Sequence, residues 1–179
     1  MGLTRYRNLI ILGAVCPVLL FADLLTKSLT NGRDFTVIPH LLRFSSYHND
    51  GIAYSWLSGV PNAVISVITS VLIIAAIATY VWYTKKTAKP ATNNANATPN
   101  TRSGSHPPHP HIAFAFFITG AVGNLIDRIF FGYVRDFVSF SFFPPVFNLA
   151  DFWLTVGVIY LAVIFLIDGA GKKNDGKKS

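Results

Sequence analysis

The chain has 179 residues, of which 51% are hydrophobic and only 13% are charged, and its mean hydropathy is +0.45. These values exclude an ordinary soluble domain of this length, which carries about a quarter charged residues. The net charge of +7 does not indicate nucleic-acid binding, because the basic residues are separated by long apolar stretches instead of forming one patch. We therefore expect an integral membrane protein without a nucleic-acid partner.

Four apolar stretches, at about 9–28, 61–83, 111–131 and 147–168, are long enough to cross a membrane, since a spanning helix needs roughly 20 mostly apolar residues. They predict an all-α membrane protein with four transmembrane helices in a single domain, residues 1–171. Ten of the fifteen Lys and Arg residues lie before the first stretch, between the second and third, or after the fourth. The positive-inside rule places these segments, and both termini, in the cytoplasm. The acidic residues are all Asp, and most lie at or beyond the other face: Asp23, Asp34, Asp50, Asp127, Asp136 and Asp151.

The connecting segments differ in character. Residues 33–58, on the extracytoplasmic side, contain runs at 35–38 and 41–47 whose β-branched and aromatic content predicts a small β segment packed at the membrane surface. The other extracytoplasmic connection, 132–146, is short and ends in Pro144-Pro145, so we expect a tight loop there. The linker 84–110 has almost no bulky apolar residues and is expected to be disordered in the cytoplasm, and 172–179 is expected to be a solvated basic tail.

Polar residues gather where the third and fourth spans meet at the outer face. Within each span they recur at helical spacing and so share one helix face. The short connection between the spans makes the two helix ends neighbours and brings one further acid to the same place. The residues concerned are Asn124, Asp127, Arg128, Asp136, Asn148 and Asp151.

This group can supply a pair of carboxylates. Two carboxylates within hydrogen-bond distance do not both ionise easily, so the pair divides into a base and an acid that can activate a water against an amide bond. Spacing alone does not choose between Asp136 and Asp127 as the partner of Asp151, and we expect Asp127 to pair with Arg128 or to cap the loop. No Ser, His or Cys stands in these motifs with a base partner, and no His/Glu cluster suggests zinc, so we expect no metal or cofactor.

Five short motifs occur in order along the chain. They are Asp23-Leu-Leu-Thr-Lys27, Asn49-Asp-Gly51-Ile-Ala-Tyr54-Ser, Gly120-Ala-Val-Gly123-Asn124-Leu-Ile-Asp127-Arg128, Val134-Arg135-Asp136-Phe137 and Phe147-Asn148-Leu-Ala-Asp151. With this order and topology the chain resembles lipoprotein signal peptidase, the type II signal peptidase of bacteria.

The resemblance implies an aspartic endopeptidase of the bacterial cytoplasmic (inner) membrane. Such an enzyme removes the signal peptide from prolipoproteins by cleaving before a cysteine that carries diacylglycerol. The implied partners are diacylglyceryl-modified prolipoprotein signal peptides and membrane lipid, and we expect a monomer. The implied catalytic pair is Asp136 and Asp151, and the implied substrate-binding or supporting residues are Asp23, Lys27, Asn49, Gly51, Asn124, Asp127, Arg128 and Asn148.

Two residues depart from the family pattern. Tyr54 stands where Phe is usual, and Arg135 stands where an apolar residue usually precedes the catalytic Asp. We expect Arg135 to point toward lipid headgroups; the alternative is that its charge favours the ionised form of Asp136 and so adjusts which carboxylate holds the proton. The alternative function is a small proton-coupled transporter in which the same aspartates form a proton relay.

Overall fold

The computed structural model describes residues 3–51, 60–87 and 110–175. Within these ranges it contains four long helices: α1 (Leu3–Thr30), α2 (Asn62–Thr87), α3 (Pro110–Phe131) and α4 (Leu149–Asp175). Each includes a stretch of at least 18 residues that is apolar enough to cross a membrane. The prediction of four spanning helices is therefore confirmed. Because α4 extends to Asp175, the first residues assigned to the tail are helical, whereas 88–109 of the linker and 176–179 lie outside the described residues.

Helix α3 is the central helix of the bundle. Half of its spanning window is buried inside the protein, against 11% for α1 and α2 and 17% for α4. It contacts all three of the other helices, and its close approach to them is possible because small residues occupy the contact face. A Cβ atom at Gly120 would collide with the backbone oxygen of Ala150, and one at Gly123 would lie 2.7 Å from the Asp23 carboxylate. The outer faces of α1, α2 and α4 expose Val, Ile, Leu and Phe side chains, as expected for contact with lipid.

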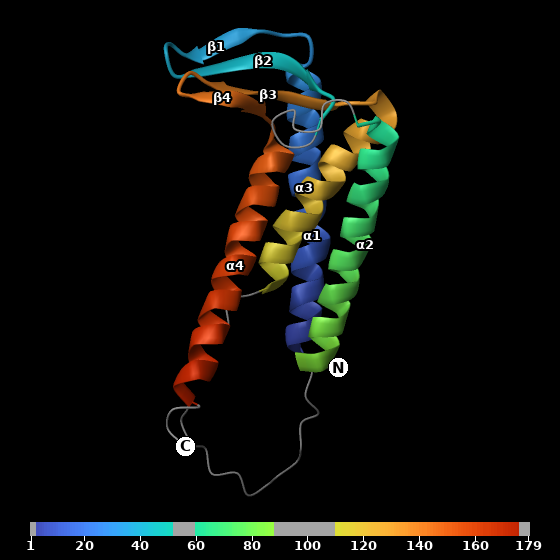
Figure 1. The fold of residues 1–179 in the computed structure, drawn as a ribbon, viewed down its shortest axis with the longest axis vertical. Coiled ribbons are helices and arrows are strands. Elements are labelled where there is room, and N and C mark those ends of the chain that lie inside the picture. Colours follow the sequence, from blue (N-terminus) through green and yellow to red (C-terminus); the bar gives the residue numbers. More distant parts are fainter. Residues whose placement is uncertain (1–2, 52–59, 88–109, 176–179) are drawn as a thin grey trace, which may run out of the picture.

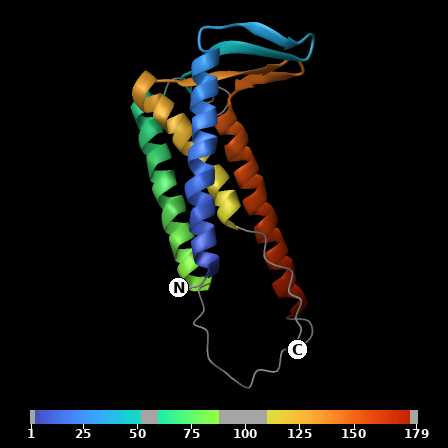
Figure 2. The ribbon, with the colours of Figure 1, turned by 180° about the vertical axis from the view of Figure 1, so that it is seen from behind.

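A four-stranded antiparallel sheet caps one end of the bundle (Figures 1 and 2). Its strands, in spatial order, are β1 (Phe35–Ile38), β2 (Leu42–Asn49), β3 (Val134–Phe140) and β4 (Phe143–Phe147). The first two confirm the predicted β segment. The expectation of a simple loop at 132–146 was wrong, because this segment forms the other half of the sheet. Pro144 and Pro145 are accommodated because β4 is an edge strand and its register with β3 shifts at this point, so neither proline is paired with a β3 residue.

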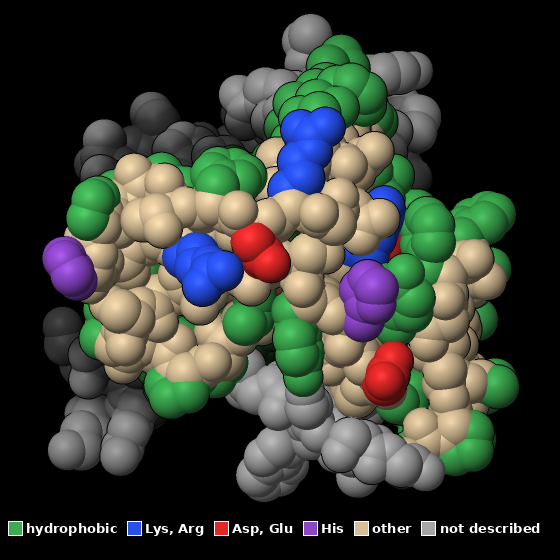
Figure 3. Space-filling model, turned by 90° about the horizontal axis from the view of Figure 1, so that it is seen from above, with side chains coloured by type: hydrophobic (Ala, Val, Ile, Leu, Met, Phe, Trp, Pro, Cys, Tyr) green, Lys and Arg blue, Asp and Glu red, His purple; other side chains and the backbone are tan. Residues whose placement is uncertain are grey.

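The sheet connects parts of the chain that are far apart in sequence. Strands β1 and β2 follow α1, and β3 follows α3 after Gly132, whose positive φ of 84° lets the chain turn sharply at the end of the helix. The start of α1 and the end of α4 lie at the end of the bundle away from the sheet (Figures 1 and 2). Seen from the sheet end, Arg, Asp and His side chains are scattered over the face, and hydrophobic side chains lie mostly toward its margin (Figure 3).

Candidate active site

The site begins at the first turn of α4, which is capped by its own polar residues. Asn148 precedes the helix, and its Oδ1 accepts a hydrogen bond from the backbone N–H of Asp151 (2.9 Å). In return, Asp151 Oδ2 accepts one from the backbone N–H of Asn148 (3.2 Å). This reciprocal arrangement is a capping box, which satisfies two helix N–H groups that have no partner within the helix. It also fixes the Asp151 carboxylate at the positive end of the helix dipole, where a negative charge is stabilised.

Asp136 lies on β3 beside this capped turn. Its side chain is only 2% exposed, and both carboxylate oxygens accept hydrogen bonds from side-chain amides. Asn148 Nδ2 donates to Oδ1 (2.5 Å) and Asn49 Nδ2 donates to Oδ2 (2.8 Å). The pairing of β2 with β3 brings Asn49 to this position, opposite Val134. Asn148 therefore contacts both candidate catalytic carboxylates, Asp136 through its side-chain amide and Asp151 through its backbone N–H.

The protonation of Asp136 is shifted by its surroundings. Burial, reinforced by the negative charge of Asp151, raises its pKa to about 7. Both effects disfavour the ionised form, whereas the amide donors and the Lys27 cation act in the opposite direction. Asp136 can therefore exchange a proton near neutral pH, which is the range in which a general acid or base is effective.

A fully buried lysine supplies positive charge beneath the two carboxylates. Lys27, on α1, forms an ion pair with Asp23 one turn earlier (Nζ–Oδ2 2.8 Å) and approaches Asp127 Oδ2 at 3.4 Å. It also donates to Asn124 Oδ1 (3.1 Å), and Asn124 Nδ2 donates to Asp151 Oδ1 (2.7 Å). Asp23 and Lys27, four residues apart on α1, are thus paired as part of a network that reaches Asp151.

Asp127 has different partners from those expected. Instead of Arg128, it binds Arg135, whose NH2 and Nε lie 2.7 and 3.3 Å from Asp127 Oδ1 and whose backbone N–H donates to Oδ2 (3.0 Å). Arg135 consequently points back to α3, and the expectation that it points toward headgroups was wrong. With its oxygens held by Arg135 and Lys27, Asp127 is not placed to share a proton with Asp151. The geometry therefore favours Asp136 over Asp127 as the partner of Asp151.

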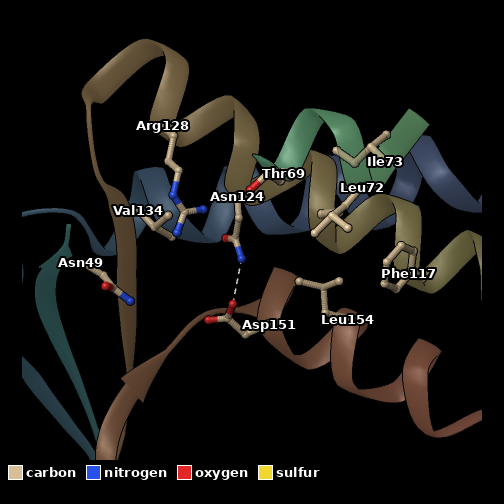
Figure 4. A pocket seen from close by; sticks show the side chains of 11 residues that line it. Asn49, Thr69, Leu72, Ile73, Phe117, Asn124, Arg128, Val134, Asp151 and Leu154 are labelled. Carbon is tan, nitrogen blue, oxygen red and sulfur yellow. Dashed lines mark hydrogen bonds between the residues drawn. The ribbon is translucent and has the colours of Figure 1, made fainter. Parts of the chain in front are cut away.

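A cavity of about 250 Å³ opens in front of Asp151 (Figure 4). At one end its wall is polar and at the other it is formed by apolar side chains of α2, α3 and α4. Asp151 lines this cavity, whereas Asp136 lies behind it, against Asn49 and Asn148. The lining residues are Asn49, Thr69, Leu72, Ile73, Phe117, Ala121, Asn124, Arg128, Val134, Asp151 and Leu154.

Arg128 is the cation on the wall of this cavity. Its NH2 donates to the backbone oxygen of Gly51 (2.8 Å), and the residue is 8% exposed. Its buried Nε has no hydrogen-bond partner among the described residues. An unpaired buried donor is costly, so this N–H is available to a substrate acceptor.

The structure thus brings together all ten residues that the sequence assigned to the site. The apolar residues that line the cavity were not predicted from the sequence. Phe117, Ala121, Asn124 and Arg128 lie at helical spacing on one face of α3, so part of the wall could have been found from the sequence. Leu72 and Ile73 could not, because α2 is almost uniformly apolar and no residue pattern marks its inner face. Tyr54 lies outside the described residues.

Comparison with known proteins identifies the family. The family model described as signal peptidase (SPase) II matches residues 15–167. A lipoprotein signal peptidase from Staphylococcus aureus is 32% identical over 146 residues, covering 80% of this chain and 77% of that protein. The corresponding protein of Staphylococcus aureus strain JH9 is 32% identical over 145 residues, covering 79% of this chain and 76% of that protein.

Solved structures give the same result. Two structures described as bacterial membrane enzymes superpose with TM-scores of 0.68 and 0.62, at 29% and 30% sequence identity. The first covers 88% of each chain, and the second covers 85% of this chain and 90% of its own. Because the family match spans most of the sequence and includes every motif described above, the chain belongs to the signal peptidase II family of membrane proteases.

Proposed function

We propose that this protein removes the signal peptide of bacterial prolipoproteins by cleaving before the S-diacylglyceryl cysteine, with Asp136 and Asp151 activating a water. The observation that carries the proposal is the link through Asn148, whose side-chain amide donates to the buried Asp136 carboxylate and whose backbone N–H donates to the Asp151 carboxylate at the edge of a cavity. Membership of a family that processes lipoprotein precursors supplies the substrate class.

The charge balance of the site supports a shared proton. Among the described residues of the cluster, the carboxylates are Asp23, Asp127, Asp136 and Asp151, and the cations are Lys27, Arg128 and Arg135. Burying uncompensated charge is expensive. One proton on the Asp136/Asp151 pair leaves three negative and three positive charges, so the singly protonated pair is the electrically neutral state of the cluster.

The two carboxylates have distinct environments and therefore distinct roles. Asp151 lies at the N-terminus of α4 and faces the cavity, so it is the ionised base that takes a proton from water. The resulting hydroxide bonds to the carbonyl carbon, and the carbonyl oxygen takes the proton of Asp136. When the C–N bond breaks, the proton on Asp151 passes to the leaving nitrogen and the hydroxyl proton returns to Asp136.

The surrounding donors would hold the substrate during these steps. The free Nε–H of Arg128 points to a role in binding a backbone carbonyl of the signal peptide or the charge that develops on the scissile one. The apolar end of the cavity, between α2 and α4, suits a small apolar side chain or the start of an acyl chain (Figure 4). Lys27, Asp23 and Asp127 do not contact substrate in this scheme and instead set the charge of the site.

The proposed membrane placement follows from the distribution of charge. The basic segments mark the cytoplasmic ends of the helices, so the sheet and the active site lie at the extracytoplasmic face of the inner membrane. There the anchored diacylglyceryl group of the substrate remains in the bilayer while the peptide bond reaches the cavity. We propose that a single copy of the chain carries out the reaction, because every residue assigned a role comes from one chain.

A pair of matched substrates tests this function. A prolipoprotein peptide carrying S-diacylglyceryl cysteine and its unmodified twin are incubated with the purified protein, and the products are identified by mass spectrometry. We expect cleavage immediately before the modified cysteine, little or no cleavage of the twin, and unchanged activity in a metal chelator. Equal cleavage of both peptides, or activity that is lost on chelation and restored by zinc, would contradict the proposal.

A further inference from the structure

We propose that Arg135 is a positioning residue for Asp136, because its side chain fastens the start of β3 to the last turns of α3. This inference rests on the proposed function, since it concerns the geometry of the Asp136/Asp151 pair. It also accounts for the arginine at a position where the family pattern has an apolar residue.

Arg135 contacts α3 at two points that lie one helical turn apart. Its guanidinium group binds Asp127 Oδ1 through NH2 (2.7 Å) and Nε (3.3 Å). The same group stacks over the ring of Phe131, with Cζ 4.1 Å from the ring centroid. Asp127 and Phe131 are four residues apart and therefore share a face of α3. The guanidinium is held between a carboxylate and an aromatic face, an arrangement that suits its planar shape.

The backbone of Arg135 adds a further contact with Asp127. Its N–H donates to Asp127 Oδ2 (3.0 Å), so the two oxygens of one carboxylate hold the main chain and the side chain of the same residue. In any variant the N–H bond can persist, but it alone does not fix the rotation of the Asp127 carboxylate. Lys27 at 3.4 Å is shared with Asp23 and lies on the same oxygen as the N–H. The side chain of Arg135 is therefore the partner that holds Oδ1.

The next residue after Arg135 is Asp136, and successive residues of a strand point to opposite faces. Holding Arg135 against α3 thus directs Asp136 toward Asn148 and α4, where it is buried. The turn before β3 contains Gly132 at a positive φ, and Tyr133 and Val134 alone separate it from Arg135. The contacts of Arg135 with α3 therefore restrain the short segment that carries the Asp136 carboxylate. A displacement of about 1 Å in a catalytic group can cost as much as a hundredfold in rate.

The test compares R135A with R43A, in which an exposed arginine of the neighbouring strand β2 is removed. Turnover of the lipidated peptide is measured over a range of substrate concentrations, and folding is checked by thermal unfolding. For R135A we expect kcat to fall by about tenfold with KM unchanged, partial recovery in millimolar guanidinium chloride, and an intermediate kcat for R135K. R43A should behave as wild type, with no response to guanidinium.

Specific results would overturn the inference. The inference is wrong if R135A has the wild-type kcat. It is also wrong if R135A loses kcat but guanidinium does not restore it and R135K is no more active than R135A. If R135A does not purify in a folded form, R135Q, which fills the space with one neutral amide donor, is measured in its place against the same criteria. D136N separates this inference from the proposed function: an active D136N refutes the function, whereas an inactive D136N with wild-type R135A refutes only the role of Arg135.

Discussion

Replacement of Lys27 by methionine is the most demanding test of the buried charge network. Methionine has a similar length but carries no charge, so K27M keeps most of the packing and removes only the cation. Lys27 is fully buried, and its Nζ lies 2.8 Å from Asp23 and 3.4 Å from Asp127. Asp127 retains Arg135, but Asp23 keeps only the backbone N–H of Ala150 among its described donors (2.8 Å).

The expected loss of stability follows from the carboxylate charge that remains buried without a cation. Removing one partner of a buried ion pair typically costs about 3–5 kcal/mol, because the other charge is left uncompensated. For a chain of this size each kcal/mol lowers the melting temperature by about 2–4 °C, so K27M should melt about 6–20 °C below wild type. The assay is thermal unfolding of the purified protein in detergent, followed by tryptophan fluorescence. K85M removes an exposed lysine from α2 and should shift the melting temperature by less than about 2 °C.

A second substitution separates charge from packing. In D23N/K27M the uncompensated carboxylate is also removed, so the double variant should recover part of the lost stability despite carrying two changes. K27M should also move the activity profile to higher pH, because the Lys27 cation lowers the pKa of Asp136. Melting of K27M within about 2 °C of wild type, or a D23N/K27M variant less stable than K27M, would refute the account of this network.

Other changes are expected to act through the protonation of Asp136, the contact between α3 and α4, and the cap of α4. Because the folded-state pKa of Asp136 is raised to about 7 from its ordinary value of 3.8, the folded chain binds the proton more tightly. Stability should therefore fall as pH rises from about 4 to 7 and level off above that; D136N should reduce this slope in pH-dependent melting, and an unchanged slope would contradict the assignment. G120A should lose about 1–3 kcal/mol of stability and much of its activity, because the new Cβ meets the backbone oxygen of Ala150. The control G13A, whose new Cβ meets nothing within 4 Å, should keep its melting temperature and turnover in the same assays. N148S should keep the cap of α4 but lose about 1–3 kcal/mol of stability and at least tenfold in turnover, because serine lacks the amide that binds Asp136; wild-type turnover would show that this contact is dispensable.

The helices could be predicted from sequence because membrane crossing imposes a length and a composition on each of them. The second half of the sheet could not. Strand β3 does contain Val and Phe residues, but Arg135 and Asp136 interrupt them near its start, and β4 contains two prolines, which disfavour a strand. Strand β3 depends on pairing with β2, which lies about ninety residues earlier in the chain, and β4 in turn pairs with β3. Pairing over that distance leaves no local pattern to detect.

The residues of the site could be predicted from the sequence, but most of the contacts between them could not. Composition and spacing located the polar cluster, and the motifs identified its members. Spacing did not reveal that Asn148 bridges Asp136 to Asp151, although the sequence Asn-x-x-Asp before an apolar run is itself a capping-box pattern. The partners of Asp127 were also missed, because the turn at Gly132 brings Arg135 back to α3 and adjacency in sequence favoured Arg128.

The most direct test of the central claim is the turnover of a diacylglyceryl-modified prolipoprotein peptide by D136N and D151N. D34N serves as the matched control, since it makes the same substitution at an exposed aspartate of the segment before β1. We expect D136N and D151N to fold but not to cleave the peptide before its modified cysteine, whereas D34N should cleave it at the wild-type rate. Cleavage at the wild-type rate by either D136N or D151N would contradict the assignment of these two carboxylates as the water-activating pair.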